Sequence, residues 1–380
     1  MPLQGIKVLE FAGLAPAPFC GMILKEFGAS VTRIDKVGQT HTIDVLGNGK
    51  SSIAMDLKHT KSVDIVKKLC KVSDVLIEPF RPGVMEKLGL GPNILLAENP
   101  RLIYARLTGF GQKGLYSLRA GHDINYIAIS GVLSLLGRYN EKPTFPINLI
   151  ADFAGGGLLC AFGIALALLE RFKSNKGQVI DSNMVEGAAY VASWITRSQH
   201  LPIWGNERGK NILDTGSHFY DTYKTKDNKY MAVGAIEPQF YVKFIEGLGL
   251  SVNDVPQFSN MEESKKIISD KFLQKTQEEW CEIFENVDAC VTPVLTMSEA
   301  PDNKHNKERE SFISSTEYNH KIPKPAPFLY RTPGMTRANL SNTLPGKDTI
   351  TILQKLNYNK QEIDDLISSG VVEQSKMSKL

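Results

Sequence analysis

The chain has 380 residues, of which 42% are hydrophobic and 22% are charged, which is ordinary for a globular protein of one large or two smaller domains. Its 44 basic and 41 acidic residues leave a net charge of +3, so the charge balance predicts no nucleic-acid partner and no general attraction to an anionic membrane. The five cysteines are scattered, form no CxxC pair and do not cluster with histidines, which predicts buried free thiols and no metal site.

The first half of the chain alternates between predicted strands and predicted helices. This alternation is typical of an α/β fold, here a Rossmann-like, doubly wound parallel sheet in a large domain. Ligands of such sheets bind beyond the carboxyl ends of the strands. Short apolar runs predict strands at residues 6–11, 31–35, 52–55, 74–77, 102–107 and 179–181, and apolar residues at helical spacing predict helices at 17–27 and 62–72.

The loop after the first predicted strand reads AGLAPAPFCG at residues 12–21. It lacks the GxGxxG pattern that binds a dinucleotide pyrophosphate, and its two prolines do not suit a loop that cradles phosphate. The sequence therefore argues against a nicotinamide-dependent dehydrogenase.

The second half of the chain predicts a smaller α+β domain. Residues 220–235 alternate around Asp227 and Asn228, which indicates a hairpin. We expect a large domain at 1–185 that 328–380 completes, a linker at 186–219, the small domain at 220–302 and a return linker at 303–327. Helices are predicted at 153–172, 185–200, 239–247, 262–270, 277–285 and 361–369, with a further strand at 291–295.

Three segments bear on targeting and membrane insertion: the two ends of the chain and one apolar stretch. The start, MPLQGIKVLEFAG, has neither a basic region nor a long apolar region, so we expect no signal peptide. Residues 158–169 are apolar but shorter than the roughly 20 residues that span a bilayer, which predicts a buried helix and no membrane span. The last residues, Ser378, Lys379 and Leu380, match the signal for the peroxisomal import receptor. The expected location is the peroxisome, with the mitochondrion as a second one.

Two motifs carry groups that suit proton transfer. His122 stands in GHDINY at 121–126, a predicted polar turn, and Asp152 stands in ADFAGGG at 151–157, at the predicted start of a helix. A base that works near neutral pH and a carboxylate facing it can remove a proton from one side of a carbon and return it to the other. Taken alone, Asp152 could be a helix N-cap and His122 a structural histidine. Asp123 and Asn125 suit turn formation.

Five motifs, in this order, resemble those of the α-methylacyl-CoA racemases, which share the family III CoA-transferase fold. They are GHDINY, ADFAGGG, GQVID at 177–181, MVEGAAY at 184–190 and GAIEPQFY at 234–241. The similarity extends over residues 1–300 and is looser after that. The resemblance implies an interlocked homodimer with the active site between the large domain of one chain and the small domain of the other.

The resemblance also implies the reaction. Such a protein racemises 2-methyl-branched acyl-CoA thioesters through an enolate, in the degradation of branched-chain fatty acids and bile-acid-type side chains. His122 and Asp152 would face opposite sides of the α-carbon, with no cofactor beyond the CoA of the substrate. The backbone N–H of Asp123 and the start of the helix at residue 153 are candidates for holding the enolate oxygen. Glu237 would support protonated His122 from the partner chain, although an acid before Pro238 also suits a plain helix start.

The resemblance places CoA along the strand ends of the large domain. Lysine stands at residue 36, where the family usually has arginine, so the charge is kept while the bidentate fork and the stacking plane are lost. Each charged residue in this set could instead be ordinary solvated charge. The implied CoA-binding residues are Lys36, Met55, Asp56, Leu57, Lys58, Pro79, Phe80, Arg81 and Lys87, with Gly121, Asp123, Ile124, Asn125 and Tyr126 against the pantetheine and thioester.

Two other functions remain open. In a family III CoA-transferase, Asp152 would be a nucleophile that forms covalent anhydride intermediates, and His122 would not be needed. Such transferases carry a glycine-rich loop in the second domain, where this chain has GAIEPQFY. A non-catalytic CoA-binding protein would need neither His122 nor Asp152.

Overall fold

The computed structural model describes residues 1–39 and 43–375, which form two compact units. The large unit contains Met1–Ser130, Pro146–Val191 and the chain from Lys304 onward, and the small unit contains Gly131–Phe145 and Ala192–Asn303. This division differs from the expected boundaries, because residues 131–145 group with the small unit and residues 304–327 with the large one. The SKL motif at 378–380 lies outside the described residues, so its targeting role stays a prediction.

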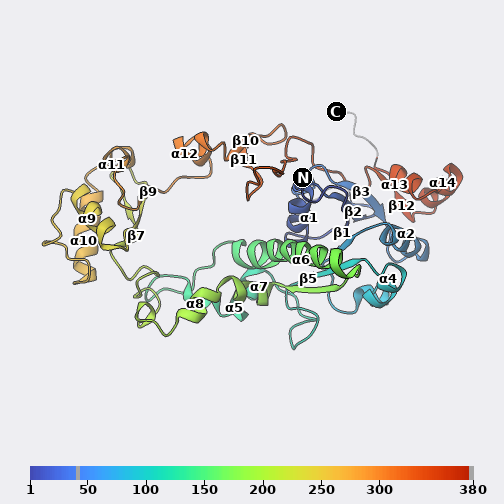
Figure 1. Cartoon of the computed structure of the whole chain (residues 1–380), viewed down its shortest axis with the longest axis horizontal. Helices are drawn as coiled ribbons and strands as arrows, with labels where there is room; N and C mark the ends of the chain where they lie inside the picture. Colours follow the sequence, from blue (N-terminus) through green and yellow to red (C-terminus); the bar gives the residue numbers. More distant parts are fainter. Residues whose placement is uncertain (40–42, 376–380) are drawn as a thin grey trace. The chain divides into compact units, whose positions relative to one another are not determined.

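A seven-stranded mixed sheet organises the large unit, as the alternation of strands and helices predicted (Figure 1). Its order is β12-β3-β2-β1-β4-β5-β6, and every pairing is parallel except that of β12 with β3. The order of strands reverses between β1 and β4, which is the position where doubly wound sheets bind ligands. The strands are β1 (Lys7–Phe11), β2 (Ser30–Lys36), β3 (Ser51–Met55), β4 (Val75–Glu78), β5 (Ile103–Thr108), β6 (Val179–Asn183) and β12 (Val372–Glu373).

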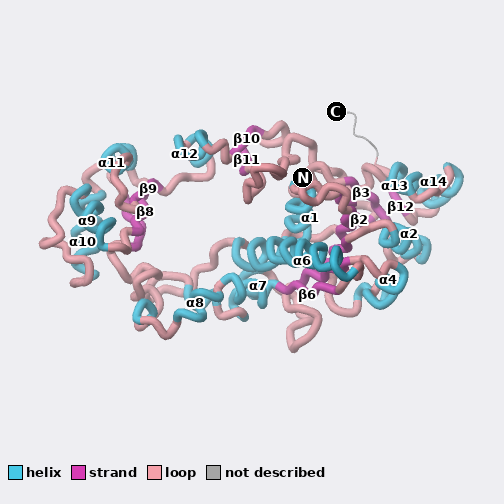
Figure 2. Tube along the Cα trace, viewed as in Figure 1, coloured by secondary structure: helices cyan, strands magenta, loops and turns pink. Residues whose placement is uncertain are grey.

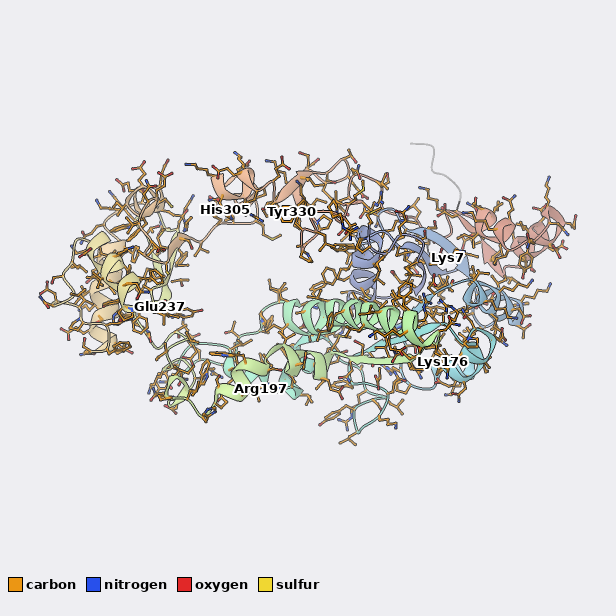
Figure 3. All side chains as sticks on the ribbon, in the orientation of Figure 1. Lys7, Lys176, Arg197, Glu237, His305 and Tyr330 are labelled. Carbon is orange, nitrogen blue, oxygen red and sulfur yellow. The ribbon has the colours of Figure 1, made fainter. Side chains whose placement is uncertain are left out.

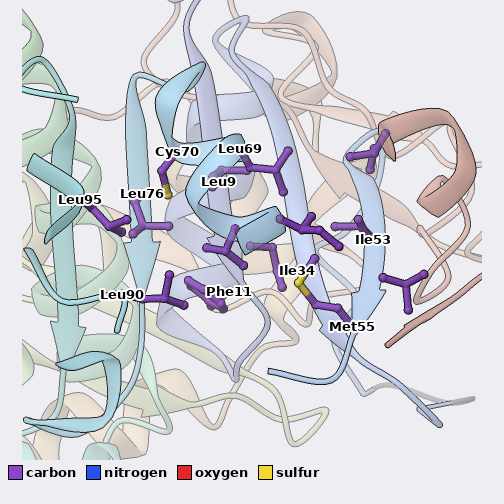
Figure 4. Packing of buried hydrophobic residues seen from close by; sticks show 14 of the residues in the cluster. Leu9, Phe11, Ile34, Ile53, Met55, Leu69, Cys70, Leu76, Leu90 and Leu95 are labelled. Atoms are coloured by element: carbon purple, nitrogen blue, oxygen red, sulfur yellow. The ribbon is translucent and has the colours of Figure 1, made fainter. Parts of the chain in front are cut away.

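Helices cover both faces of this sheet. Neighbouring strand residues point to opposite faces, so Val8 packs in one hydrophobic cluster and Leu9 in the other. Figure 4 shows the second cluster, in which Leu9, Leu76 and Leu69 pack together. Each fully buried aliphatic side chain contributes about 1.5–3 kcal/mol. One face carries α1 (Pro16–Glu26) and α6 (Leu159–Ser174), and the other carries α2 (Thr60–Lys71), α4 (Pro92–Glu98), α13 (Thr349–Lys355) and α14 (Lys360–Ser368).

A buried ion-pair network fastens β2 to the C-terminal part of the chain. The Arg33 guanidinium, 1% exposed, donates to Asp35 at 2.9 Å, to Asp44 at 3.1 Å and to the carbonyl of Thr343 at 2.8 Å. Buried charges are stable only when opposite charges and hydrogen bonds satisfy them, and Arg33 has both. This network therefore holds the segment after residue 337 against the sheet.

A second buried pair lies beside it. Lys50 Nζ donates to both carboxylate oxygens of Glu10, at 3.0 and 2.8 Å, and to the carbonyl of Pro18 at 2.9 Å. Burial raises the pKa of Glu10 to about 7, although Lys50 opposes this shift. A Cβ at Gly21 would collide with the Glu10 carboxylate, so only glycine at this position of α1 leaves room for the pair.

The helix predicted at 153–172 begins earlier and changes type. A π-helix, η2 (Leu149–Leu158), continues directly into α6, so the start predicted at residue 153 was wrong. The combined helix, Leu149–Ser174, is long and apolar enough to cross a membrane by length and composition alone, a test that core helices also pass. Only 44% of its most apolar stretch is buried in the chain, so the prediction of a buried helix holds for about half of it.

Two further helices differ from expectation. The helix predicted at 185–200 is interrupted at Ala192 and forms α7 (Met184–Val191) and α8 (Ser193–Ser198). The GHDINY motif, predicted as a turn, contains the start of α5 (Asp123–Ile129). The prediction that all cysteines are buried was also wrong, because Cys290 is exposed and Cys281 partly so, while all five thiols are free.

The small unit is a three-stranded antiparallel sheet with helices packed on it. Figure 2 colours its strands magenta and its helices cyan. The predicted hairpin is confirmed, and Asn228 at its tip has a φ of 63°, which asparagine tolerates well. Trp280 and Phe272 lie at the centre of its aromatic core. The elements are β7 (Tyr220–Lys224), β8 (Tyr230–Gly234), β9 (Val291–Pro293), α9 (Pro238–Gly247), α10 (Met261–Phe272) and α11 (Gln277–Phe284).

Candidate active site

A cleft of about 370 Å³ opens in the large unit beyond the carboxyl ends of its central strands. Leu14 follows β1, Pro79 and Arg81 follow β4, and Met184 follows β6, so the cleft spans the reversal point of the sheet. His122 also lines the cleft. The cleft therefore lies where the alternation of strands and helices predicted a ligand.

His122 is held at the start of α5. It is the last residue before the helix, and its backbone N–H donates to Oδ1 of Asn125 at 3.0 Å. The Tyr126 hydroxyl donates to the carbonyl of Gly121 at 2.5 Å, which fixes the backbone just before His122. A Cβ at Gly121 would lie 2.7 Å from the Tyr126 ring, so glycine permits this close contact. The GHDINY motif thus forms a rigid cap that presents an exposed imidazole to the cleft.

Asp152 lies in the first turn of η2. The glycines of ADFAGGG allow η2 to pack closely against α7 and α1. A Cβ at Gly155 would lie 2.5 Å from the backbone nitrogen of Ala188 in α7, and a Cβ at Gly187 would collide with the backbone of Gly155. A Cβ at Gly157 would lie 2.7 Å from the carbonyl oxygen of Pro16 in α1. The glycine run therefore serves backbone contact between helices, and π-helical turns of this kind often occur at functional sites.

The environment of Asp152 favours its protonated form. The side chain is 7% exposed, and its Oδ2 accepts a hydrogen bond from Asn148 at 2.7 Å. Burial raises the pKa of Asp152, and the negative charge of Asp123 raises it further, while the Asn148 hydrogen bond and the charge of His122 lower it. The charge of His122 therefore reaches the Asp152 carboxylate. Asp152 is not its helix's N-cap, because Asn148 occupies that position.

Asp123 is a buried anchor, which its interpretation as a turn former missed. It is 1% exposed, and its Oδ2 accepts hydrogen bonds from the backbone N–H groups of Ala151 and Asp152, each at 2.8 Å. Within the described residues its other oxygen, Oδ1, is buried without a hydrogen-bond partner.

Burial raises the pKa of Tyr126 to about 12, with added effects of Asp152 and Asp123 and an opposing effect of Arg81.

The loop that carries Arg81 is fixed by a charged cluster in which Glu78 and Arg106 are buried and Glu86 is exposed. Glu78, at the end of β4, accepts the backbone N–H of Phe80 at 2.8 Å and the Nε of Arg106 at 2.8 Å. Arg106 also donates to both carboxylate oxygens of Glu86, at 2.7 and 3.2 Å. Burial raises the pKa of Glu78 to about 7, against the lowering effects of Phe80 and Arg106. Glu86 lies in α3 (Val84–Lys87), so one arginine clamps two segments that carry predicted CoA contacts.

The other predicted CoA residues do not line the cleft. Most of them lie at or after the carboxyl ends of β2, β3 and β4. Lys36 ends β2 and pairs in register with Met55, which ends β3. The Met55 side chain is 1% exposed and belongs to the hydrophobic core, so only its backbone is available to a ligand. The roles of these residues in binding CoA stay predictions. Asp56, Leu57 and Lys58 follow β3, Phe80 packs on Phe11, Lys87 ends α3, and Ile124 is exposed on α5.

Glu237 belongs to the small unit, where Figure 3 labels it. It is exposed and precedes α9, and its carbonyl accepts the N–H groups of Phe240 and Tyr241. Its charge contributes to the raised pKa of Cys290, after burial. Its position thus fits the simple helix-start alternative, and its predicted support of His122 stays a prediction.

Sequence reasoning missed three further residues of the site. Arg119 lines the cleft with Arg81 and stacks on Tyr116 at 4.5 Å from the ring centre, and nothing in its local sequence indicated this. Asn148 stands four residues before Asp152, and a correct helix start would have revealed the contact. The contact of Arg106 with Glu78 could be predicted only with the knowledge that β4 pairs with β5. Across the described part of the chain, no cluster of three or more potential ligands suits a metal ion.

Comparisons with known proteins agree with this arrangement. The model of CoA-transferase family III matches residues 3–340. The chain is 52% identical to the alpha-methylacyl-CoA racemase of Homo sapiens over 99% of both chains. It is 29% identical to the human succinyl-CoA:glutarate CoA-transferase, covering 98% of this chain and 90% of that one.

A solved structure shares the fold. The CAIB/BAIF family protein from Brucella suis aligns with a TM-score of 0.79 at 23% identity, over 94% of this chain and 99% of that one. The family model covers both units and every residue of the cleft. This chain therefore belongs to CoA-transferase family III.

Proposed function

We propose that this protein is an α-methylacyl-CoA racemase, which interconverts the two configurations of 2-methyl-branched acyl-CoA thioesters. The observation that carries the proposal is the joint presence of His122 at the cleft and of a buried Asp152 carboxyl whose pKa is raised and is affected by the charge of His122. The 52% identity to the human racemase over nearly the whole chain supports the same reaction.

The reaction moves one proton across the α-carbon. One of the two groups, His122 or Asp152, removes the proton from one face, and the electron pair passes to the thioester carbonyl as an enolate. The other group, which starts protonated, returns a proton to the opposite face. General acid–base catalysis of this kind contributes about 10²–10⁴-fold. A raised pKa suits Asp152 to this work, because a more basic carboxylate takes the α-proton more readily.

The enolate oxygen needs hydrogen-bond donors as well. The N–H groups in the first turn of a helix have no acceptor within the helix, and α5 begins at Asp123 directly beside His122. We assign the thioester oxygen to this helix start, where the helix dipole also favours negative charge. The start of η2 suits this task less well, because Asp123 already accepts the N–H groups of Ala151 and Asp152.

CoA is the proposed ligand of the cleft. Arg81 and Arg119 line it and supply positive charge for phosphate or for a polar pantetheine group. The Glu78–Arg106–Glu86 cluster fixes the loop that carries Arg81. We also assign Lys36, Lys58 and Lys87 to CoA, since they lie at or after the carboxyl ends of β2, β3 and β4.

A homodimer is part of the proposal. Five large side chains of the η2–α6 helix lie on one face at intervals of three or four residues and are each at least 50% exposed. An apolar stripe of this kind marks a contact surface, and a second copy of the chain would cover it. In sedimentation analysis we expect a dimer that Phe162→Glu dissociates. The stripe consists of Leu158, Phe162, Leu166, Leu169 and Phe172.

The competing function is CoA transfer, with Asp152 as nucleophile. It is disfavoured because it gives His122 no task, and because the identity to the human transferase is 29% against 52% to the racemase. A racemase and a transferase differ in whether the α-hydrogen exchanges with solvent.

The test is incubation of the protein with one pure 2-methylacyl-CoA epimer in D₂O. We expect deuterium at the α-carbon and formation of the other epimer without any acceptor acid. A transferase would leave the α-hydrogen in place and would require an acceptor, and a non-catalytic CoA-binding protein would do neither. Either of these results overturns the proposal.

A further inference from the structure

We propose that the Asp123 side chain is a positioning residue that joins the two proton-transfer groups and places a buried negative charge at the backbone of Asp152. This inference rests on the racemase function proposed above. It assigns a task to the side chain, whereas the oxyanion site concerns only the backbone at this position.

The geometry gives Asp123 a direct link to both groups. It follows His122 in sequence and is the first residue of α5. Its Oδ2 accepts the backbone N–H groups of Ala151 and Asp152, both at 2.8 Å, although these residues lie 28 and 29 positions away. Since N–H groups in the first turn of a helix lack acceptors of their own, Asp123 caps η2 from another element. One oxygen atom therefore ties the start of α5 to the start of η2.

The charge of Asp123 is only partly balanced. The side chain is 1% exposed, and Oδ1 is buried and has no hydrogen-bond partner among the described residues. In a structural role, a buried carboxylate normally has its oxygens satisfied. Because the side chain is buried from water, its field acts on a neighbouring carboxylate more strongly than it would at the surface.

Asp152 is the carboxylate that this field reaches. After burial, Asp123 is the main factor that raises the pKa of Asp152, and His122 and the hydrogen bond from Asn148 oppose it. On α5, Tyr126 is also affected by both aspartates. The other elements packed against η2 bring further charges that do not contribute to the pKa of Asp152. They are Lys25 and Glu26 of α1, Arg106 of β5, Glu170, Arg171 and Lys173 of α6, Asp181 of β6 and Glu186 of α7.

Three variants separate the mechanical link from the charge. Asp123→Asn keeps a carbonyl oxygen for the two N–H groups and removes the charge, with its amide nitrogen in the place of the unpartnered Oδ1. Asp123→Ala removes both. Asp181→Asn is the matched control, because Asp181 also accepts a backbone N–H, from Gln112 at 3.2 Å, and does not affect Asp152.

The first measurement does not depend on turnover. The carboxyl carbon resonance of Asp152, assigned by its loss in Asp152→Asn, is followed against pH in each variant. Because the negative charge of Asp123 raises the pKa of Asp152, Asp123→Asn must move the titration to lower pH, and Asp181→Asn must leave it in place. An unchanged titration in Asp123→Asn overturns the inference even if the protein is an active racemase. If Asp123→Asn does not fold, Asp123→Ser replaces it, since its hydroxyl oxygen also accepts N–H groups without a charge.

The second measurement connects the charge to catalysis. Two-base racemisation needs one proton on the His122–Asp152 pair, so the acid limb of kcat/KM reports the first deprotonation of the pair, to which Asp152 contributes. We expect this limb at lower pH in Asp123→Asn. In Asp123→Ala we expect kcat to fall about 10- to 100-fold and the Tm to fall by about 2–8 °C. An acid limb that superimposes on that of the unsubstituted protein contradicts the inference. An unsubstituted protein that exchanges no α-hydrogen contradicts the racemase function, and the NMR titration then still decides the role of Asp123.

Discussion

Two groups of buried charges in the large unit, one around Arg33 and Lys50 and one around Asp123 and Asp152, differ in how completely their hydrogen bonds are satisfied. Arg33 has three acceptors and Lys50 has three, so each charge in that network is matched by partners. At the start of α5 and η2, one Asp123 oxygen has no hydrogen-bond partner among the described residues. Asp152 accepts a hydrogen bond from Asn148, and the positive charge that affects it there is that of the more exposed His122. We therefore expect substitutions in the first set to affect stability and substitutions in the second set to affect activity.

The largest expected effect lies in the under-satisfied set. His122→Ala and Asp152→Ala should each lower racemisation by at least about 10²–10⁴-fold, because each removes one proton-transfer group. Their Tm should change little. Racemisation rates measured by chiral separation of the acyl-CoA epimers, together with CoA affinity by calorimetry, check this. Full activity in either variant would refute the role of that residue.

A substitution in the group around Arg33 should affect stability alone. Arg33→Met removes the guanidinium that balances the buried charges of Asp35 and Asp44, which should lower the free energy of unfolding by about 3–5 kcal/mol. Urea unfolding measures this loss. The kcat of the molecules that remain folded should match that of the unsubstituted protein. A large loss of kcat at unchanged stability would abolish the distinction between the two sets.

The glycine run of η2 connects stability to activity. Gly155→Ala places a Cβ 2.5 Å from the Ala188 nitrogen and 2.7 Å from the Gly187 carbonyl carbon, which are backbone atoms that cannot move aside cheaply. We expect about tenfold or greater loss of activity and a loss of about 1–3 kcal/mol in stability. Gly163→Ala, farther along the same helix, is the control, since its Cβ would meet only the Ile180 side chain at 3.7 Å. Equal effects of the two substitutions would remove the packing argument.

The smallest expected effect concerns the loop of Arg81. Glu78→Gln can still accept the Phe80 N–H but loses its charged contact with Arg106, so the loop is less well fixed. We expect a rise in the KM for acyl-CoA of about three- to tenfold with kcat unchanged, because CoA contacts bind the substrate and the transition state alike. Glu98→Gln, which removes an exposed ion pair with Lys71, should leave both constants unchanged. A fall in kcat alone would place Glu78 in the chemical step instead.

Periodic features of the sequence predicted the sheet, and contacts between distant segments escaped prediction. Strands such as β4 and β5 are fully buried and mostly apolar, so their residues alone indicate them. The two-residue strand β12 depends on pairing with β3 and has no pattern of its own. The start of η2 was missed because an aspartate before an apolar run usually marks an N-cap, whereas here Asn148 takes that position.

The same distinction holds at the site. His122 and Asp152 were predicted because each stands in a motif typical of the family. The buried role of Asp123 was not, because its hydrogen-bond partners lie 28 and 29 residues away and only the fold brings them together. Arg119 was missed for the same reason, since its position in the cleft follows from the course of the loop after β5.

The most direct test of the two-base account is α-hydrogen exchange in the single-base variants. In D₂O, His122→Ala retains only Asp152, so it should exchange the α-hydrogen of one epimer, with retention of configuration, and leave the other epimer unlabelled. Asp152→Ala should label the opposite epimer. Mass spectrometry of the separated epimers measures both. If both variants label the same epimer, or if each labels both epimers equally, the two groups do not serve opposite faces of the carbon and the account is wrong.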